Sequence, residues 1–79
     1  MFNVVLSETA YSQLKDLPGF ISKRIFEKVN KLSENPLSLN VKKLVNLPFY
    51  RLRLGDYRIL FELNNKNKSI IIIKVGHRK

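Results

Sequence analysis

The sequence predicts a two-layer α+β domain in which two helices pack on one face of a mainly antiparallel sheet, in the order strand, helix, helix, strand, strand, strand. Two patterns support this class. Apolar residues recur every three or four positions in much of the first half of the chain and every second position in the second half. The chain has 79 residues, fewer than the roughly 100–200 of a typical domain, so we expect residues 1–79 to form a single domain.

The first half of the chain is predicted to form one strand and two helices. Apolar residues alternate over residues 2–6, as in a strand with one face on the core. Ser7 can cap a first helix over residues 8–17, which Pro18 and Gly19 end. A second helix then runs to about residue 35. Its apolar stripe consists of Ile21, Ile25, Val29 and Leu32, and we expect Phe20 and Phe26 to widen it.

The second half of the chain is predicted to form strands. Residues 37–48 show weak periodicity and form a connection, in which a short strand around residues 41–44 is one alternative. Strands over residues 49–54 and 57–63 are joined by Gly55 and Asp56, a two-residue hairpin turn. A polar loop leads to a β-branched strand over residues 69–75, and residues 76–79 form a short tail.

The hairpin turn fixes which side chains share a face. With Gly55 and Asp56 in the turn, Arg53 lies opposite Arg58, so Arg51 joins them on one face. The opposite face is apolar and consists of Tyr50, Leu52, Leu54, Tyr57, Ile59 and Phe61. We expect both tyrosines to pack in the core, with stacking on RNA bases as the alternative.

The last strand is placed by the cost of burying a charge. Pairing Leu63 with Ser69 sets Lys74 opposite Arg58 and directs Ile71, Ile73 and Val75 into the core. A one-residue slip would bury Lys74, and an unpaired buried ammonium group is costly. The sequence therefore predicts that Arg51, Arg53, Arg58 and Lys74 share one face of the sheet.

The charge distribution points to a polyanionic partner. The net charge is +9, and residues 41–79 carry +8 of it, with ten basic and two acidic residues. Nucleic acid is the first candidate, an acidic protein the second and a membrane surface the third. Like charges across strands repel, and guanidinium groups bind phosphate with two donors at once. The alternative is a solvated outer face whose basic residues serve solubility.

Several classes of site are excluded by composition. The chain has no cysteine and one histidine, His77, so we expect no metal and no cofactor. It also lacks a phosphate-binding glycine-rich loop and a paired-carboxylate site. No apolar run reaches membrane-spanning length and no signal peptide is evident, so we expect a cytoplasmic protein without a membrane partner. His77 can exchange protons near neutral pH, or it is simply a solvated tail residue.

Three segments carry a resemblance to a known family. They are Lys43-Leu44, the run Phe-Tyr-Arg-Leu-Arg-Leu-Gly-Asp-Tyr-Arg-Ile at residues 49–59, and Lys-Val-Gly-His-Arg at residues 74–78. Together they resemble the RelE/ParE toxin superfamily of type II toxin–antitoxin systems. The resemblance implies a RelE-like toxin that cuts mRNA in the ribosomal A site, inhibits translation and is held in check by an antitoxin. A ParE-like toxin that binds DNA gyrase without cutting RNA is the alternative.

The same resemblance implies roles for individual residues. Arg58 and Arg78 would clamp the scissile phosphate, and Arg51 and Arg53 would stabilise developing charge. His77 is the candidate for proton transfer, and the lysines implied in RNA binding are Lys43, Lys74 and Lys79.

The end of the chain departs from the family pattern. RelE-like nucleases commonly carry a tyrosine several residues beyond the position of Arg78, whereas this chain ends at Lys79. Either the natural protein lacks the tyrosine or the chain is shortened. We therefore expect weak or no cleavage by the 79-residue chain.

Overall fold

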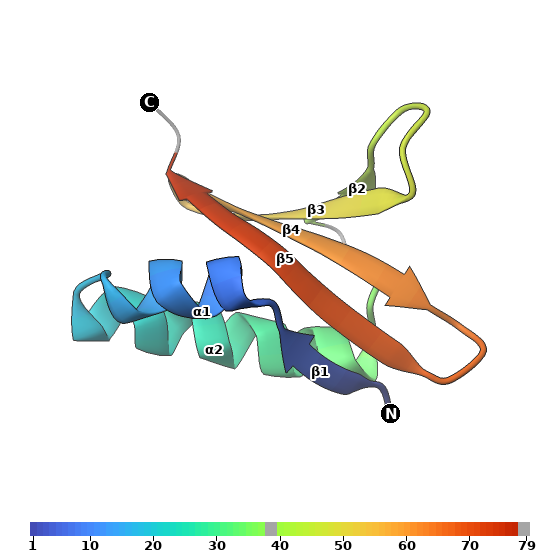
Figure 1. The fold of residues 1–79 in the computed structure, drawn as a ribbon, viewed down its shortest axis with the longest axis horizontal. Helices are drawn as coiled ribbons and strands as arrows, with labels where there is room; N and C mark the ends of the chain where they lie inside the picture. The colour runs from blue at the N-terminus through green and yellow to red at the C-terminus, as the bar shows by residue number, and fades with distance from the viewer. Residues whose placement is uncertain (38–39, 78–79) are drawn as a thin grey trace.

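The two helices lie on one side of a five-stranded sheet (Figure 1). The computed structural model describes residues 1–37 and 40–77. Its elements are β1 (Asn3–Leu6), α1 (Glu8–Lys15), α2 (Gly19–Glu34), β2 (Val41–Lys43), β3 (Phe49–Leu54), β4 (Tyr57–Asn64) and β5 (Ser69–His77). The strand order is β1-β5-β4-β3-β2, with β1 parallel to β5 and the other pairs antiparallel. The predicted α+β class is confirmed, and the short strand considered around residues 41–44 is present as β2.

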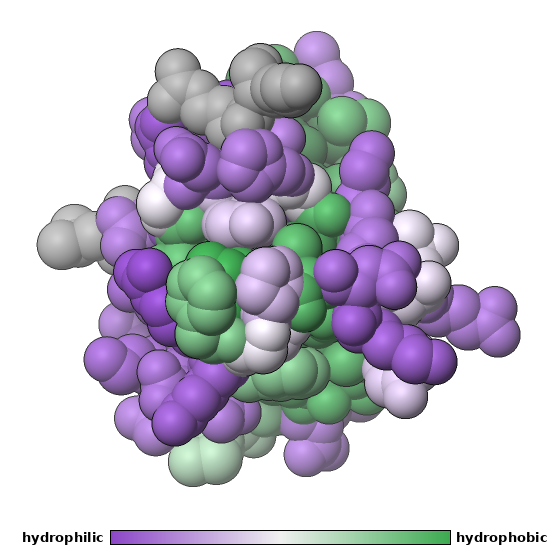
Figure 2. All heavy atoms as spheres, turned by 90° about the vertical axis from the view of Figure 1, so that its left-hand side faces the viewer, coloured by the Kyte–Doolittle hydropathy of each residue, from purple (hydrophilic) through white to green (hydrophobic). Residues whose placement is uncertain are grey.

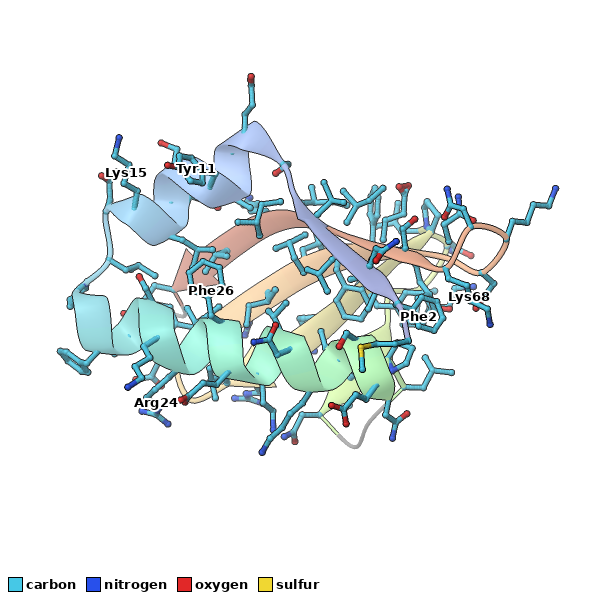
Figure 3. All side chains as sticks on the ribbon, turned by 90° about the horizontal axis from the view of Figure 1, so that it is seen from below. Phe2, Tyr11, Lys15, Arg24, Phe26 and Lys68 are labelled. Atoms are coloured by element: carbon cyan, nitrogen blue, oxygen red, sulfur yellow. The ribbon has the colours of Figure 1, made fainter. Side chains whose placement is uncertain are left out.

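The helices bury one stripe each against the sheet. Ser7 caps α1, because its hydroxyl oxygen accepts a hydrogen bond from the backbone N–H of Ala10 at 3.0 Å. The buried helix residues are Ala10 and Leu14 of α1 and Ile25, Val29 and Leu32 of α2. The prediction that Phe20 and Phe26 widen the stripe is wrong, since they are 69% and 43% exposed. Each residue advances a helix by about 100°, which turns Phe26 away from Ile25, and Figure 3 shows Phe26 extending towards α1.

The hairpin formed by β3 and β4 has the predicted register. Leu54 pairs with Tyr57 and Arg53 with Arg58, and Gly55 takes φ 58° in the turn, a conformation that glycine adopts easily. The apolar face supplies the centre of the core, where Leu52, Ile59 and Phe61 are fully buried and Tyr50, Leu54 and Tyr57 pack around them. The prediction that the two tyrosines are packing residues is confirmed.

The register of β5 differs from the prediction. Ser69 pairs with Asn64, so Ile70 and Ile72 are buried instead of Ile71 and Ile73. The pairing then shifts by one residue between Leu60 and Phe61 of β4, because Ile73 forms a bulge in β5 and has no partner in β4. It returns Lys74 to solvent and buries Val75, so the core takes both isoleucines without burying a charge.

The bulge also changes the partners of the last residues of the strand. Lys74 lies opposite Leu60, and Gly76, not Lys74, lies opposite Arg58. Gly76 and His77 continue β5 instead of forming a tail, because Arg58 and Tyr57 at the start of β4 offer them backbone partners.

Two side chains from the helix layer hold the end of β5. β1 pairs with β5 only as far as Ile72, so the strand continues beyond its parallel neighbour. There the Ser7 hydroxyl donates to the carbonyl oxygen of Ile73 at 2.7 Å, and the Gln13 Oε1 accepts from the N–H of Val75 at 2.6 Å. These bonds satisfy backbone groups that no strand pairs, and they fix the segment that carries Lys74 and Gly76.

Candidate functional site

Basic side chains gather on the outer face of the sheet. This face is turned away from α1 and α2 (Figure 1). Paired residues share a face, so the register defines two rows across the strands. The first row runs Lys42, Arg51, Leu60, Lys74, and the second runs Arg53, Arg58, Gly76. The prediction that the three arginines share a face is confirmed.

Two hollows lie over these rows. The first hollow has a volume of about 180 Å³ and is lined by Asn40, Lys42, Arg51 and Arg53. The second hollow has a volume of about 270 Å³ and is lined by Arg51, Arg58, Leu60, Lys74, Gly76 and His77. Arg51 lines both, so the two hollows form one continuous cationic surface.

The electrostatics of this face favour an anion. Arg53 and Arg58 lie directly opposite each other and are both exposed. Such a pair of like charges is destabilising by itself. The carboxylate of Glu62 belongs to the same face, but its register partners are Phe49 and Ile71, two residues along β4 from Leu60. A phosphate group in either hollow would offset the repulsion, and guanidinium groups can bind two of its oxygens at once.

His77 borders the second hollow at the end of β5, but its side chain lies on the same face of the sheet as Tyr57, which is opposite to the face of Arg58. It is in register with Tyr57, and the two rings meet edge to face with centroids 4.8 Å apart and an angle of 76° between their planes. The contact holds the imidazole against the tyrosine ring. On the core side, Tyr50 stacks on Phe61 at a centroid distance of 5.5 Å.

Lys42 is the residue of this face that the sequence analysis missed. It pairs with Arg51, whereas Lys43, for which RNA binding was predicted, pairs with Tyr50 and so lies on the opposite face of the sheet from the arginines. The available signal was Val41, which packs on the core and so directs the next residue outward. Arg78 and Lys79, for which roles were predicted, lie outside the described residues.

A second basic surface lies along α2. A hollow of about 320 Å³ is lined by Lys28, Lys31, Leu32, Glu34, Asn35 and Leu52, and a neighbouring one of about 160 Å³ by Arg24, Glu27, Lys28, Lys31 and Leu54. Figure 3 shows Arg24 projecting from the side of α2 that is remote from α1. Figure 2 views the end of the molecule where the α1–α2 and β3–β4 turns lie, and shows hydrophobic side chains framed by hydrophilic ones. The two hollows along α2 together form the α2 groove, whose lining combines Leu32, Leu52 and Leu54 with three basic residues, Arg24, Lys28 and Lys31, and two acidic ones, Glu27 and Glu34.

Neither a membrane span nor a metal cluster is found in the part of the chain that the structure describes. Within residues 1–37 and 40–77, no helix is long and apolar enough to cross a membrane. The same residues contain no group of three or more histidine, aspartate or glutamate side chains that could hold a metal ion.

The fold and its cationic outer face define a small, basic α+β protein suited to a phosphate-bearing partner. Residues 4–79 match the family described as ParE toxin of type II toxin–antitoxin system, parDE. The chain belongs to this RelE/ParE toxin family, as the segments at residues 43–44, 49–59 and 74–78 indicate.

Named relatives and solved structures agree with this membership. The chain is 41% identical over 81 residues to Toxin RelE3 of Methanocaldococcus jannaschii, covering 96% of this chain and 90% of that protein. Its fold is similar to the toxin–antitoxin complex RelBE2 of Mycobacterium tuberculosis, with a TM-score of 0.89, 29% identity and 98% of both chains covered. It is also similar to the archaeal RelE–RelB complex of Pyrococcus horikoshii OT3, with a TM-score of 0.86, 31% identity and coverage of 98% and 94%.

Proposed function

We propose that this protein is a RelE-type endoribonuclease that acts in the cytoplasm as a single toxin domain, cuts mRNA in the ribosomal A site and so inhibits translation. The observation that carries this proposal is the convergence of Lys42, Arg51, Arg53, Arg58 and Lys74 on an outer face that the helices leave open. A cationic face of this kind suits the backbone of a single RNA strand.

The reaction that fits such a face uses the RNA's own 2′-hydroxyl as nucleophile. Its proton is removed, the oxygen attacks the adjacent phosphorus, and the bond from phosphorus to the 5′-oxygen breaks. That 5′-oxygen takes up a proton, and the products are a 2′,3′-cyclic phosphate and a free 5′-hydroxyl. The phosphoryl group gains negative charge on the way, and fixed positive donors lower the barrier by stabilising that charge.

The position of each residue in the two hollows suggests its role in this reaction. Arg58 lines the second hollow and would hold the scissile phosphate together with Arg78. Arg51, which lines both hollows, and Arg53 would stabilise the developing charge. His77 borders the same hollow and would move a proton once its ring turns from Tyr57 towards the phosphate. Lys42 and Lys74, on the same face, would hold the neighbouring RNA backbone together with Lys79.

An antitoxin protein is the proposed regulatory partner. The similar structures from Mycobacterium tuberculosis and Pyrococcus horikoshii are toxin–antitoxin complexes. The α2 groove supports such a partner, because its apolar floor of Leu52 and Leu54 and its basic rim of Lys28 and Lys31 suit an acidic amphipathic segment. The α2 groove and the two hollows of the outer face share no lining residue, so substitutions can test protein binding and RNA binding separately.

The deciding experiment compares Arg58→Ala with Lys66→Ala in mRNA cleavage on programmed ribosomes. The Arg58 variant should cut at least about a hundredfold more slowly, the usual effect of removing one contact to a developing negative charge. Lys66 lies in the exposed turn between β4 and β5 and should have no effect. Equal cleavage by both variants would contradict the proposal. Inhibition of gyrase supercoiling by the wild-type chain, without RNA cleavage, would favour the ParE-like alternative.

A further inference from the structure

Gly76 is a glycine that the fold itself does not require. Gly55 adopts a φ of 58° in the hairpin turn, where other residues are strained. Gly76, in contrast, is the next-to-last residue of β5 and has an ordinary φ, and a Cβ built on it meets nothing within 4 Å. Glycine weakens a strand interior, and it often marks a place where a ligand or another backbone approaches closely.

The location of Gly76 indicates what approaches it. Gly76 is in register with Arg58, so a side chain at position 76 would lie on the outer face next to the Arg58 side chain. It also lines the second hollow together with Arg51 and Lys74. The empty space above Gly76 is therefore bordered by three cationic side chains.

We propose that Gly76 is a positioning residue for the substrate, whose missing side chain lets the sugar–phosphate backbone of a single-stranded RNA lie directly on β5 beside Arg58. This inference rests on the proposed function, and it adds a steric requirement to the electrostatic one. Any larger residue would occupy the second hollow and hold the phosphate away from the Arg58 guanidinium. A charge-assisted hydrogen bond weakens steeply once its donor and acceptor separate.

Filling the space at Gly76 should lower RNA affinity without lowering the stability of the fold. Gly76→Val places a β-branched residue in a strand, so the thermal unfolding temperature should stay the same or rise. Its affinity for a labelled single-stranded RNA oligonucleotide should fall about tenfold or more, the scale of one lost hydrogen bond to a charged group. Gly76→Ala, which adds only the Cβ, should show a smaller loss. Gly19→Ala is the matched control, because a Cβ there also meets nothing within 4 Å but lies at the start of α2.

Fluorescence anisotropy with the four variants Gly76→Val, Gly76→Ala, Gly19→Ala and Arg58→Ala distinguishes the outcomes. Weak binding in both Arg58→Ala and Gly76→Val, with an unfolding temperature no lower than wild type in the latter, supports the inference. Weak binding in Arg58→Ala alone overturns the inference and leaves the proposed function standing. Wild-type binding in both overturns both. A lowered unfolding temperature in Gly76→Ala would assign the glycine to the fold and also overturn the inference.

Discussion

RNA binding to the outer face should weaken steeply with salt, and the size of the effect follows from the side chains around the two hollows. These basic side chains are Lys42, Arg51, Arg53, Arg58 and Lys74. Each phosphate neutralised on a single strand contributes about −0.7 to the slope of log affinity against log salt concentration, so five contacts give about −3.5. Between roughly 50 and 200 mM salt, the affinity should therefore fall about a hundredfold.

The informative perturbation is Arg51→Ala, because Arg51 lines both hollows. Removing one phosphate contact should reduce the magnitude of the slope by about 0.7, to about 2.8, and weaken binding most at low salt. Lys66→Ala changes the net charge by the same amount but lies in the exposed β4–β5 turn, so its slope should equal that of the wild type. Anisotropy of a labelled single-stranded RNA, titrated at several salt concentrations, measures all three slopes.

Two results would refute this reasoning. A slope near zero in the wild-type chain would mean that the outer face makes no phosphate contacts with RNA. Equal slopes for Arg51→Ala and Lys66→Ala would mean that net charge, and not the arrangement around the hollows, governs binding.

Three further tests address the partner, the chemistry and the fold. Lys28→Glu should weaken binding of the cognate antitoxin in calorimetry without changing RNA affinity, and the reverse pattern would reject the α2 groove as its docking surface. His77→Ala should slow mRNA cleavage by roughly 10² to 10⁴ times, the usual contribution of a positioned proton carrier. Unchanged cleavage by His77→Ala would exclude His77 as the proton carrier. Gln13→Ala, which leaves the N–H of Val75 without its 2.6 Å bond, should lower the free energy of unfolding in urea by about 1–3 kcal/mol, and an unchanged value would make that bond dispensable.

The hairpin of β3 and β4 could be predicted to the residue because its information is local. Gly55 and Asp56 allow a two-residue turn, and the alternation of Arg51, Arg53 and Arg58 with apolar residues then leaves one register. The positions of Arg51, Arg53 and Arg58 follow from these two facts alone. This is why the central part of the candidate site could be placed from the sequence.

The register of β5 could not be predicted because its determinants are distant or ambiguous. Residues 70–73 are four consecutive isoleucines, so no alternation indicates which of them face the core. The bulge that resolves this is held by Ser7, which is 66 residues away from Ile73 in the sequence. The pairing of Gly76 with Arg58 depends on that bulge, and a pattern search over neighbouring residues cannot find it.

The two hydrogen bonds of the Ser7 hydroxyl can be separated by substitution, which tests whether the bulge positions the site. The hydroxyl accepts from Ala10 N–H at 3.0 Å and donates to the Ile73 carbonyl at 2.7 Å. Ser7→Ala removes both bonds and should lower the free energy of unfolding by about 1–2 kcal/mol. Ser7→Asp restores only the helix cap, because an ionised carboxylate accepts but cannot donate. We therefore expect the aspartate variant to retain the protection of α1 in amide hydrogen exchange, and to lose protection over residues 73–77 together with RNA affinity. Wild-type exchange in residues 73–77 of this variant would show that the end of β5 holds its place without Ser7.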